Sequence, residues 1–566
     1  KAEELYIVRD KFKELYEQYK KAAGLNDGQL MPLRRVSEAR CVSPMEGSLL
    51  QGEEMAKMKV GDVLDYILEP KNYEVKKKPG EWIEPREGLA ATFQEDVKKR
   101  AIEYLKEGKE KLANLPAGFL TDFFYGVSGS VRAKSFAKEG WGDFIDLADE
   151  LVRGNYAQQE FTGCFSAILI ALRDGFGEGE IRIDFDDCTA EKVWEILEVL
   201  VHSSRGDTAT PREEGAKEDP THTMLTLVTG QAMELTVSFG IICKTKLTGF
   251  YESFVRDKMR ECWNFVADTI RQPGVNCAFG LNFARICWLD EEWVQTGAAN
   301  IFRPELWDET WGTYVSWGRP SARCFRILIE QGMYGQAVEL LGRGYEYGYP
   351  YRKKPDEGLV EHLMIGFFNG WIEFEHAVLN RFFENATAEL RGKAAKFLTT
   401  GFKAVNEQGG TEKENVAVRM REYWNKRVAA IKDNAEKDEK EAMELTGWVA
   451  DSVLPAKETL GLLDESLNLS GGKIGRMGDA RDFAKGVCRL GEGNELLALR
   501  CLKKAAVDEN MHMTWARIQE PLVDFLGAMV DMPEDVRSAA IEVADAYGRY
   551  NPDKFRGVWE KLDKRK

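Results

Sequence analysis

Apolar residues recur along the chain with the spacing of an amphipathic helix. In the segment 189–203, five of them fall at positions i, i+3, i+4, i+7 and i+8, namely Val193, Ile196, Leu197, Leu200 and Val201. This spacing places them in one stripe on one face of a helix, which predicts that the face is buried. Thr189 stands before the stripe, where we expect it to cap the start of the helix.

The same spacing returns later in the chain, and each occurrence predicts a helix of about three to four turns. The positions are Leu359, Leu363, Met364 and Phe367, then Leu390, Ala394, Phe397 and Leu398, and then Val536, Ala540, Val543, Ala544 and Tyr547. Strict alternation of apolar and polar residues, which is typical of a strand, is scarce. The candidate "EIRIDFDD" at 180–187 is short and isolated, and "HTMLTLVTG" at 222–230 is ambiguous.

Short segments rich in glycine, proline and polar residues separate the predicted helices, for example at 175–180, 467–474 and 532–538. Many amphipathic helices with short connections favour stacked helix pairs, because a single helix hairpin cannot bury its apolar face alone. The predicted fold is therefore all-α, an α-solenoid of irregular helix-pair repeats of the HEAT or TPR kind.

The length of 566 residues gives a prior of roughly four domains at about 150 residues each, but a continuous repeat array would not divide in that way. We expect an N-terminal helical segment at 1–130, middle helical repeats at 131–300 and C-terminal helical repeats at 301–566. Two stretches have the composition of long loops, 71–88 and 203–222. The second is expected to be a mobile loop between helices of the middle repeats.

Composition and charge narrow the possible partners. Hydrophobic residues make up 44% of the chain and charged residues 30%, which indicates a folded protein with a hydrated surface. The net charge of −16 would repel phosphate backbones, so we expect no nucleic-acid partner. No run of 18 apolar residues occurs, and the N-terminal 21 residues have a charged helical pattern, so we expect no membrane partner either.

Ten cysteines are spread along the chain without a C-x-x-C pair, which predicts reduced, mostly buried thiols, no disulfide and a cytoplasmic location. Cys164, Cys324 and Cys501 lie in amphipathic helical patterns, where a thiol acts as a small apolar filler. The chain begins with Lys1 instead of methionine, from which we expect a fragment of a larger protein.

Two of the five histidines, His362 and His376, lie in the segment 357–397 among carboxylates and phenylalanines. Glu361 and His362 resemble part of a zincin motif, but the second zinc ligand would stand at position 366, which is Gly366. Because zinc usually needs at least three good protein ligands, we predict no metal site. Histidines on a helix surface near a packed seam are the expected alternative.

An acidic run places Asp184, Asp186 and Asp187 close together. A calcium site or a nuclease carboxylate cluster would use such residues, but the glycine and the terminal glutamate of an EF-hand loop are missing. Carboxylates directly before a helix are favoured by its free N–H groups and its positive dipole end, so we predict that this run caps a helix.

No nucleotide or catalytic motif stands out. "SGGKIGR" at 470–476 contains Gly472 and Lys473, but position 467 is leucine and position 474 is isoleucine, so the phosphate loop is absent. Gly471 and Gly472 are better explained as a left-handed helix stop. We therefore predict no cofactor and no enzymatic activity in the chain as given.

The most unusual composition is "ELWDETWGTYVSWGRPSARCF", which carries Trp307, Trp311, Tyr314 and Trp317. Positions 307, 311 and 314 share one helix face, which predicts a core seam. If that face is exposed, these four residues are candidates for a protein-binding hot spot, because tryptophan and tyrosine bury large areas at low entropy cost. Exposure separates the two interpretations.

Several segments together resemble the C-terminal helical-repeat region of prokaryotic STAND-class NTPases of the anti-phage defence type. They are "SPMEGSLLQGEEMAKMKVGDVLDYILE" at 43–69, "EPREGLAATFQEDVKKRAIEYLKE" at 84–107, "LWDETWGTYVSWGRP" at 306–320, "EGLVEHLMIGFFNGWIE" at 357–373 and "LTGWVADSVLPAKETLGLLDESLNLSGGKI" at 445–474. The resemblance lies in the order of these segments and in their residue patterns, over most of the chain. The chain departs from the family in having no NTPase motif of its own.

The resemblance implies a sensor that binds a foreign, phage-encoded protein and regulates an effector and a nucleotide-binding oligomerisation module located upstream. Oligomers would then form through those upstream domains. The alternative is a HEAT-like scaffold that binds host proteins without a switch. A hydrolase that uses Glu361 and His362 would be a third class, but no motif supports it.

Overall fold

The computed structural model of the protein describes residues 48–74, 85–177, 182–202, 224–269, 273–303, 307–342, 354–433, 435–475, 479–508, 511, 515–549 and 552–563. Within these ranges every regular element is a helix and no β-strand occurs, so the predicted all-α class is confirmed. The predicted mobile loop at 203–222 lies outside the described residues, as do residues 75–84 of the predicted loop at 71–88. Among the helices that are described, none has both the length and the apolar composition needed to cross a membrane.

The chain divides into two compact units, Lys1–Phe136 and Ala137–Lys566. The three predicted segments, 1–130, 131–300 and 301–566, stay predictions. The described elements of the first unit are α2 (Gly52–Met55), α3 (Val60–Leu68), the short 3₁₀ helix η4 (Pro70–Asn72), α4 (Pro85–Leu112) and α5 (Ala117–Arg132).

In the first unit, α4 packs against α2, α3 and α5 and is kinked at Arg100, whose φ and ψ are −128° and 26°. The Arg100 guanidinium pairs with the carboxylate of Asp96 and donates to the carbonyl oxygen of Met58 at 2.9 Å. On the other side, Tyr104 Oη donates to Asp96 Oδ2 at 2.6 Å. Asp96 precedes the kink, and its buried carboxylate binds Arg100 at the kink and Tyr104 beyond it, so it holds the two halves of α4 together.

The second unit contains the remaining helices. Its first half comprises α6 (Gly140–Asn155), η5 (Gln159–Phe161), α7 (Thr162–Gly175), α8 (Asp187–His202), α10 (Val228–Lys246), α11 (Thr248–Phe250), the π-helical turn η6 (Tyr251–Val255), α12 (Arg256–Thr269), α13 (Pro273–Leu289), α14 (Glu291–Ile301), the π-helical turn η8 (Trp307–Trp311) and α15 (Gly312–Trp317).

The second half comprises α16 (Ala322–Glu330), α17 (Met333–Glu339), α18 (Pro355–Phe368), α19 (Ala377–Asn385), α20 (Ala388–Thr399), α21 (Phe402–Gln408), α22 (Gly410–Lys432), α23 (Ala435–Thr446), η9 (Gly447–Val449), α24 (Ala456–Leu469), α25 (Asp479–Leu490), α26 (Glu495–Ala505), α28 (Trp515–Gly527), η10 (Ala528–Asp531), α29 (Glu534–Gly548) and α30 (Pro552–Asp563).

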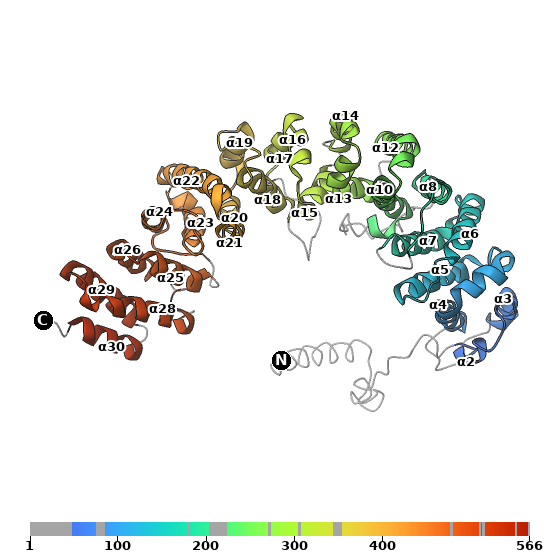
Figure 1. Ribbon diagram of the computed structural model, residues 1–566, viewed down its shortest axis with the longest axis horizontal. Coiled ribbons are helices and arrows are strands. Elements are labelled where there is room, and N and C mark those ends of the chain that lie inside the picture. Colours follow the sequence, from blue (N-terminus) through green and yellow to red (C-terminus); the bar gives the residue numbers. More distant parts are fainter. Residues whose placement is uncertain are drawn as a thin grey trace, which may run out of the picture. The chain divides into compact units, whose positions relative to one another are not determined.

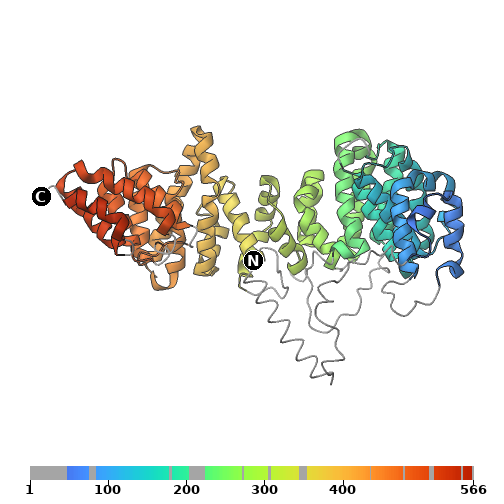
Figure 2. The same ribbon diagram turned by 90° about the horizontal axis from the view of Figure 1, so that it is seen from below.

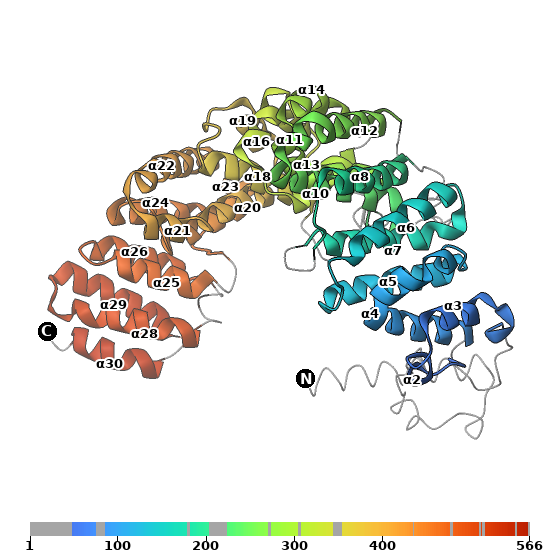
Figure 3. The ribbon, with the colours of Figure 1, turned by 45° about the vertical axis from the view of Figure 1, so that its right-hand side comes forward.

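Helices of the second unit contact one another in series rather than around one centre. One series runs from α7 through α10, α13, α15, α18 and α20 to α23, each helix packing on the next (Figure 1). Near the end of the chain, α24 packs on α26 and α26 on α29, while α25 packs on α28 and α28 on α30. Figures 1 and 3 both show these last helices side by side, and in Figure 2 every coloured element is a coiled ribbon.

The predicted apolar stripes lie in the core, except that Phe397 of α20 is only half-buried. All five stripe residues of α8 are fully buried, and so are Leu363, Met364 and Phe367 of α18 and Ala540 and Val543 of α29. The ambiguous stretch at 222–230 ends inside α10, and residues 182–186 form no strand. Burial on one face of each helix accounts for the periodicity of the sequence.

The start of α8 corrects one expectation. Helix α8 begins at Asp187, and Asp186 Oδ1 accepts the backbone N–H of Thr189 at 2.7 Å. Asp186 is therefore the cap, and Thr189 lies inside the first turn as the residue that is capped. The carboxylate run was predicted to cap a helix, and for Asp186 this is confirmed.

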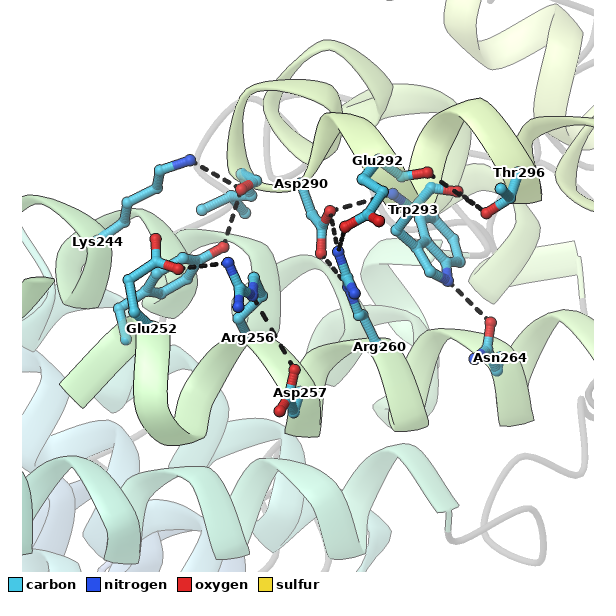
Figure 4. Close-up of polar contacts among 12 residues, drawn as sticks. Lys244, Glu252, Arg256, Asp257, Arg260, Asn264, Asp290, Glu292, Trp293 and Thr296 are labelled. Atoms are coloured by element: carbon cyan, nitrogen blue, oxygen red, sulfur yellow. Dashed lines mark hydrogen bonds and ion pairs between the residues drawn. The ribbon is translucent and has the colours of Figure 1, made fainter. Parts of the chain in front are cut away.

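Polar contacts fix α12 to the start of α14 (Figure 4). Arg260 pairs with Asp290 and, at 2.8 Å, with Glu292, while Asp290 Oδ1 accepts the N–H of Trp293 at 3.0 Å. Trp293 in turn donates from Nε1 to Asn264 Oδ1 at 2.8 Å. One carboxylate thus both caps α14 and anchors it to α12.

Candidate functional site

The ends of three helices of the second unit enclose a cavity of about 500 Å³. Its walls come from residues 315–319 at the end of α15, from the second half of α18 and from residues between 397 and 401 at the end of α20. These helices follow one another in the packing series (Figure 1), so the cavity lies between consecutive members. Sites that bind ligands typically have volumes of about 300 to 1,000 Å³.

Three half-buried aromatic side chains line the cavity: Trp317, Phe368 and Phe397. A glycine supports one of these rings, since an ideal Cβ at Gly401 would lie 2.5 Å from Phe368 Cζ. A second glycine, Gly358, lets α18 approach α15 so closely that a Cβ there would meet the Val315 carbonyl oxygen at 2.3 Å. Any side chain at Gly358 would push backbone against backbone, whereas one at Gly401 would first displace the Phe368 ring.

Polar groups are mixed with the aromatic rings. The hydroxyl of Ser316 is buried and has no hydrogen-bond partner in the described part of the chain. The half-buried Glu361 and the exposed Arg319 also line the cavity, so it carries both signs of side-chain charge. The cavity thus offers a ligand polar and apolar surface in similar amounts.

His362 forms the floor between α18 and α15. It is 1% exposed, its Nε2 lies 2.9 Å from the carbonyl oxygen of Gly318, and its Nδ1 lies 3.1 Å from Tyr334 Oη. Because a carbonyl oxygen can only accept, Nε2 carries the hydrogen, and in the neutral ring Nδ1 accepts from Tyr334. The hydroxyls of Tyr334 and Tyr314 lie 3.3 Å apart, and burial raises the pKa of both phenols above the usual value.

Both ring nitrogens of His362 are thus engaged within the protein, and the residue joins three helical elements. This burial differs from the expectation of a histidine on a helix surface. His376 lies at the start of α19, where Nδ1 accepts the backbone N–H of Val378 at 3.2 Å and caps the helix. Among the described residues, no group of three His, Cys, Asp or Glu side chains is placed to hold a metal ion.

The tryptophan-rich segment forms one continuous helix whose first turn, η8, is π-helical and whose remainder is α15. The rings of Trp307 and Trp311 stack at 4.8 Å between centroids with an interplanar angle of 15°. Trp307, Trp311 and Tyr314 are 4%, 0% and 1% exposed, so these three candidates for protein binding are interior side chains. Trp317 is only half-buried, and it is the member of the set that lines the cavity.

The remaining acidic candidates serve local structure. Asp184 forms an ion pair with Lys138 at 2.7 Å, and Asp186 caps α8. The backbone N–H of Thr189 lowers the pKa of Asp186, as expected for a capping carboxylate. Asp187 is the first residue of α8.

The glycine pair after α24 ends that helix as predicted. Gly471 and Gly472 have φ values of 62° and 82°. The N–H of Gly472 donates to the Leu467 carbonyl at 2.7 Å, and that of Gly471 donates to the Asn468 carbonyl at 3.4 Å. These two bonds form a Schellman motif, which satisfies carbonyl groups at the helix end.

The nine described cysteines are free thiols, and all except Cys188 are buried. Cys164, Cys324 and Cys501 are 0% exposed, which confirms that they fill helix interfaces. Burial raises the pKa of Cys501 to about 12, so its thiol stays protonated near neutral pH.

Sequence reasoning missed Ser316, Arg319, Phe368 and Phe397 as cavity residues. They belong to three separate segments, and only the helix packing brings them together. A detectable signal was a glycine within two residues after the end of each of these helices, at Gly318, Gly370 and Gly401. No model of a known protein family matches this chain, and a search of curated proteins finds no match either.

Proposed function

We propose that this chain is a ligand-sensing helical-repeat region that binds a foreign, phage-encoded protein and regulates an attached or upstream STAND-class NTPase or effector in antiviral defence. The fold proposed for this role is an α-solenoid of irregular helix-pair repeats. The serial helix contacts of the second unit support it, because in a solenoid each repeat packs only on its neighbours. The sensor role itself rests on the resemblance of the five segments.

The cavity at the ends of α15, α18 and α20 is the observation that carries the binding role. It lies between consecutive helices of one series, and its rings are half-buried instead of packed away. Side chains of a large partner can enter such a site while the rest of the partner lies along the neighbouring helices. In this proposal the bound partner biases the attached module by favouring one of its conformations.

The test is a pull-down with this chain from cells with and without phage infection. We expect a protein that is captured only after infection, and we expect the Trp317→Ala variant to capture at least about tenfold less of it, as for a hot-spot residue. Trp288→Ala is the control, because Trp288 is 45% exposed and does not line the cavity. Circular dichroism of each variant checks that the fold is intact.

Two results would overturn the proposal. If the same host protein is retained stoichiometrically with or without infection, the chain is a scaffold without a switch. If the purified chain hydrolyses ATP, and a mutation within it abolishes that activity, the chain is an enzyme rather than a sensor.

A further inference from the structure

We infer that the cavity accepts a basic side chain, lysine or arginine, carried by the protein partner. The inference rests on the proposed function, because it names the chemistry through which the partner is bound. Two features of the cavity lead to this inference, the polarity of the helix ends and the aromatic rings. A third reason is the way in which the chain binds its own cations at helix ends.

The cavity lies at the C-terminal ends of three helices. Helix α15 ends at Trp317, α18 at Phe368 and α20 at Thr399, and residues at or next to each end line the cavity. The C-terminal end of a helix carries the equivalent of roughly half a negative charge, and its last carbonyl groups have no partner within the helix. Carbonyl groups at these ends already accept hydrogen bonds within the chain, for example Phe397 from Thr400 and Leu398 from Gly401. The three helix dipoles around one space nevertheless favour a cation.

The rings of Trp317, Phe368 and Phe397 add a second attraction. The face of an aromatic ring is electron-rich and attracts ammonium and guanidinium groups, most strongly where water is partly excluded. These rings are half-buried in the wall of the cavity, and the carboxylate of Glu361 lines the same wall. A neutral apolar side chain would be attracted by the rings but not by the helix dipoles or the carboxylate.

The chain already binds one of its own cations in this way. Lys244 Nζ lies 4.7 Å from the centre of the Trp288 ring and donates to the carbonyl oxygens of Trp288 and Leu289, at 2.7 and 2.8 Å. Those carbonyls are at the C-terminal end of α13. A ring and carbonyl groups at a helix end thus suffice to hold a lysine in this fold.

An arginine uses one of the three helix ends at the cavity itself. Arg419 donates from Nε and Nη2 to the carbonyl oxygen of Phe368, at 3.1 and 2.8 Å. The last carbonyl group of α18 therefore attracts a guanidinium, but it is occupied by Arg419, whose positive charge opposes a second cation beside it. The chain's net charge of −16 favours the approach of a basic partner.

Arg319 opposes a cation, and it provides the sharpest test. Its guanidinium is exposed, so its repulsion is weakened by solvent and salt. Replacing it by alanine removes repulsion if the ligand is a cation, but removes the main attraction if the ligand is a carboxylate. The two ligand chemistries therefore predict opposite changes in affinity.

The experiment titrates the full 566-residue chain with capped pentapeptides that carry one arginine, lysine, glutamine or glutamate between glycines, followed by ligand-observed NMR. We expect binding of the arginine and lysine peptides and none of the glutamate peptide. Arg319→Ala should tighten arginine-peptide binding about two- to fivefold, and Phe397→Leu should weaken it by a similar factor, the range typical of cation–π contacts. Glu534→Gln removes an exposed charge on α29 and should change nothing.

Two outcomes show that the ligand is not a cation: tighter binding of the glutamate peptide, or weaker binding of the arginine peptide to Arg319→Ala. A third outcome is binding of the arginine peptide that Phe397→Leu leaves unchanged. It would show that the peptide binds to the acidic surface of the chain instead of the cavity, and it also overturns the inference. The proposed function fails separately. If no infection-specific protein is captured while the arginine peptide still binds in the cavity, the sensor role is wrong and the cation site stands. If Trp317→Ala abolishes capture but the peptides do not bind, the cation site is wrong and the sensor role stands.

Discussion

His362 Nε2 donates to the carbonyl oxygen of Gly318 across 2.9 Å, and this bond ties the middle of α18 to the residue that follows α15. Because the ring is buried, replacing it by alanine leaves this carbonyl and the Tyr334 hydroxyl with one partner fewer and opens a small cavity. We expect His362→Ala to lower the free energy of unfolding by about 2–4 kcal/mol, measured by urea denaturation.

His376→Ala is the matched control for that variant. It removes a histidine that caps α19 from a half-buried position, so the expected loss is only about 1 kcal/mol. A larger loss for His376→Ala than for His362→Ala would contradict the role assigned to the His362 network.

Asp122 in α5 makes the stability of the first unit depend on pH. Burial raises the pKa of its carboxyl from 3.8 to about 6, and Arg86 offsets only part of that shift. A raised folded-state pKa means that the folded chain keeps a proton which the unfolded chain has lost. The stabilisation of the folded state by this proton is complete below about pH 4 and is lost as the pH rises to about 6.

The isosteric variant Asp122→Asn removes this titration. We expect it to match the natural chain near pH 4 and to be more stable by about 1–2 kcal/mol at pH 7, since the carboxylate is half-buried and partly screened by solvent. Urea denaturation of both proteins at the two pH values measures the difference. An equal difference at pH 4 and pH 7 would show that Asp122 does not titrate in this window.

The helices were predictable because burial on one face leaves a local periodicity in the sequence. The stripe of α8 is an example, since its five apolar residues lie within nine positions and are all fully buried. Helix caps were less predictable. Both Asp186 and Thr189 are good capping residues, and only the backbone bond from Thr189 to Asp186 shows which one caps.

The candidate site was not predictable, because its contacts join distant residues. Tyr334 and Gly318 lie 28 and 44 positions from His362, so the segment around His362 gives no sign of either partner. The tryptophan seam differs in another way. Its first turn is π-helical, and its burial depends on packing against α13, which a local pattern does not reveal.

Gly280 permits the closest approach between α13 and the π-helical turn η8. An ideal Cβ at this position would lie 2.1 Å from the carbonyl oxygen of the buried Thr310. Gly280→Ala must therefore displace one of the two backbones, and we expect a loss of stability of about 1–3 kcal/mol or more. Thermal unfolding followed by circular dichroism measures the effect.

Gly461→Ala in α24 is the control, because a Cβ there meets no atom within 4 Å. Alanine stabilises an open helix position by about 0.5–1 kcal/mol relative to glycine. The two substitutions are chemically identical and should have opposite signs. If Gly280→Ala also stabilises the chain, the packing of η8 on α13 is looser than described.

Glu441 in α23 is fully buried and pairs with two arginines. Its Oε1 accepts from Arg427 Nε at 2.6 Å, and its Oε2 accepts from Arg427 Nη2 at 3.0 Å and from Arg391 Nε at 2.8 Å. Arg391 also pairs with Asp438, so the buried cluster holds two positive and two negative charges. Removing one carboxylate leaves an uncompensated positive charge in a site that water does not reach.

We therefore expect Glu441→Gln, which keeps the size of the side chain, to lower the free energy of unfolding by about 3–5 kcal/mol in urea denaturation. Glu542→Gln breaks a surface pair of the same kind, Lys503–Glu542 at 2.7 Å, in which both side chains are more than half exposed, and should cost less than about 1 kcal/mol. Raising the salt concentration to about 1 M should remove the effect of Glu542→Gln and leave most of that of Glu441→Gln, because salt screens exposed charges far better than buried ones. If the two variants lose equal free energies of unfolding, or if salt abolishes the effect of Glu441→Gln, then water reaches the Glu441 cluster. Its charges would then not hold α20, α22 and α23 together.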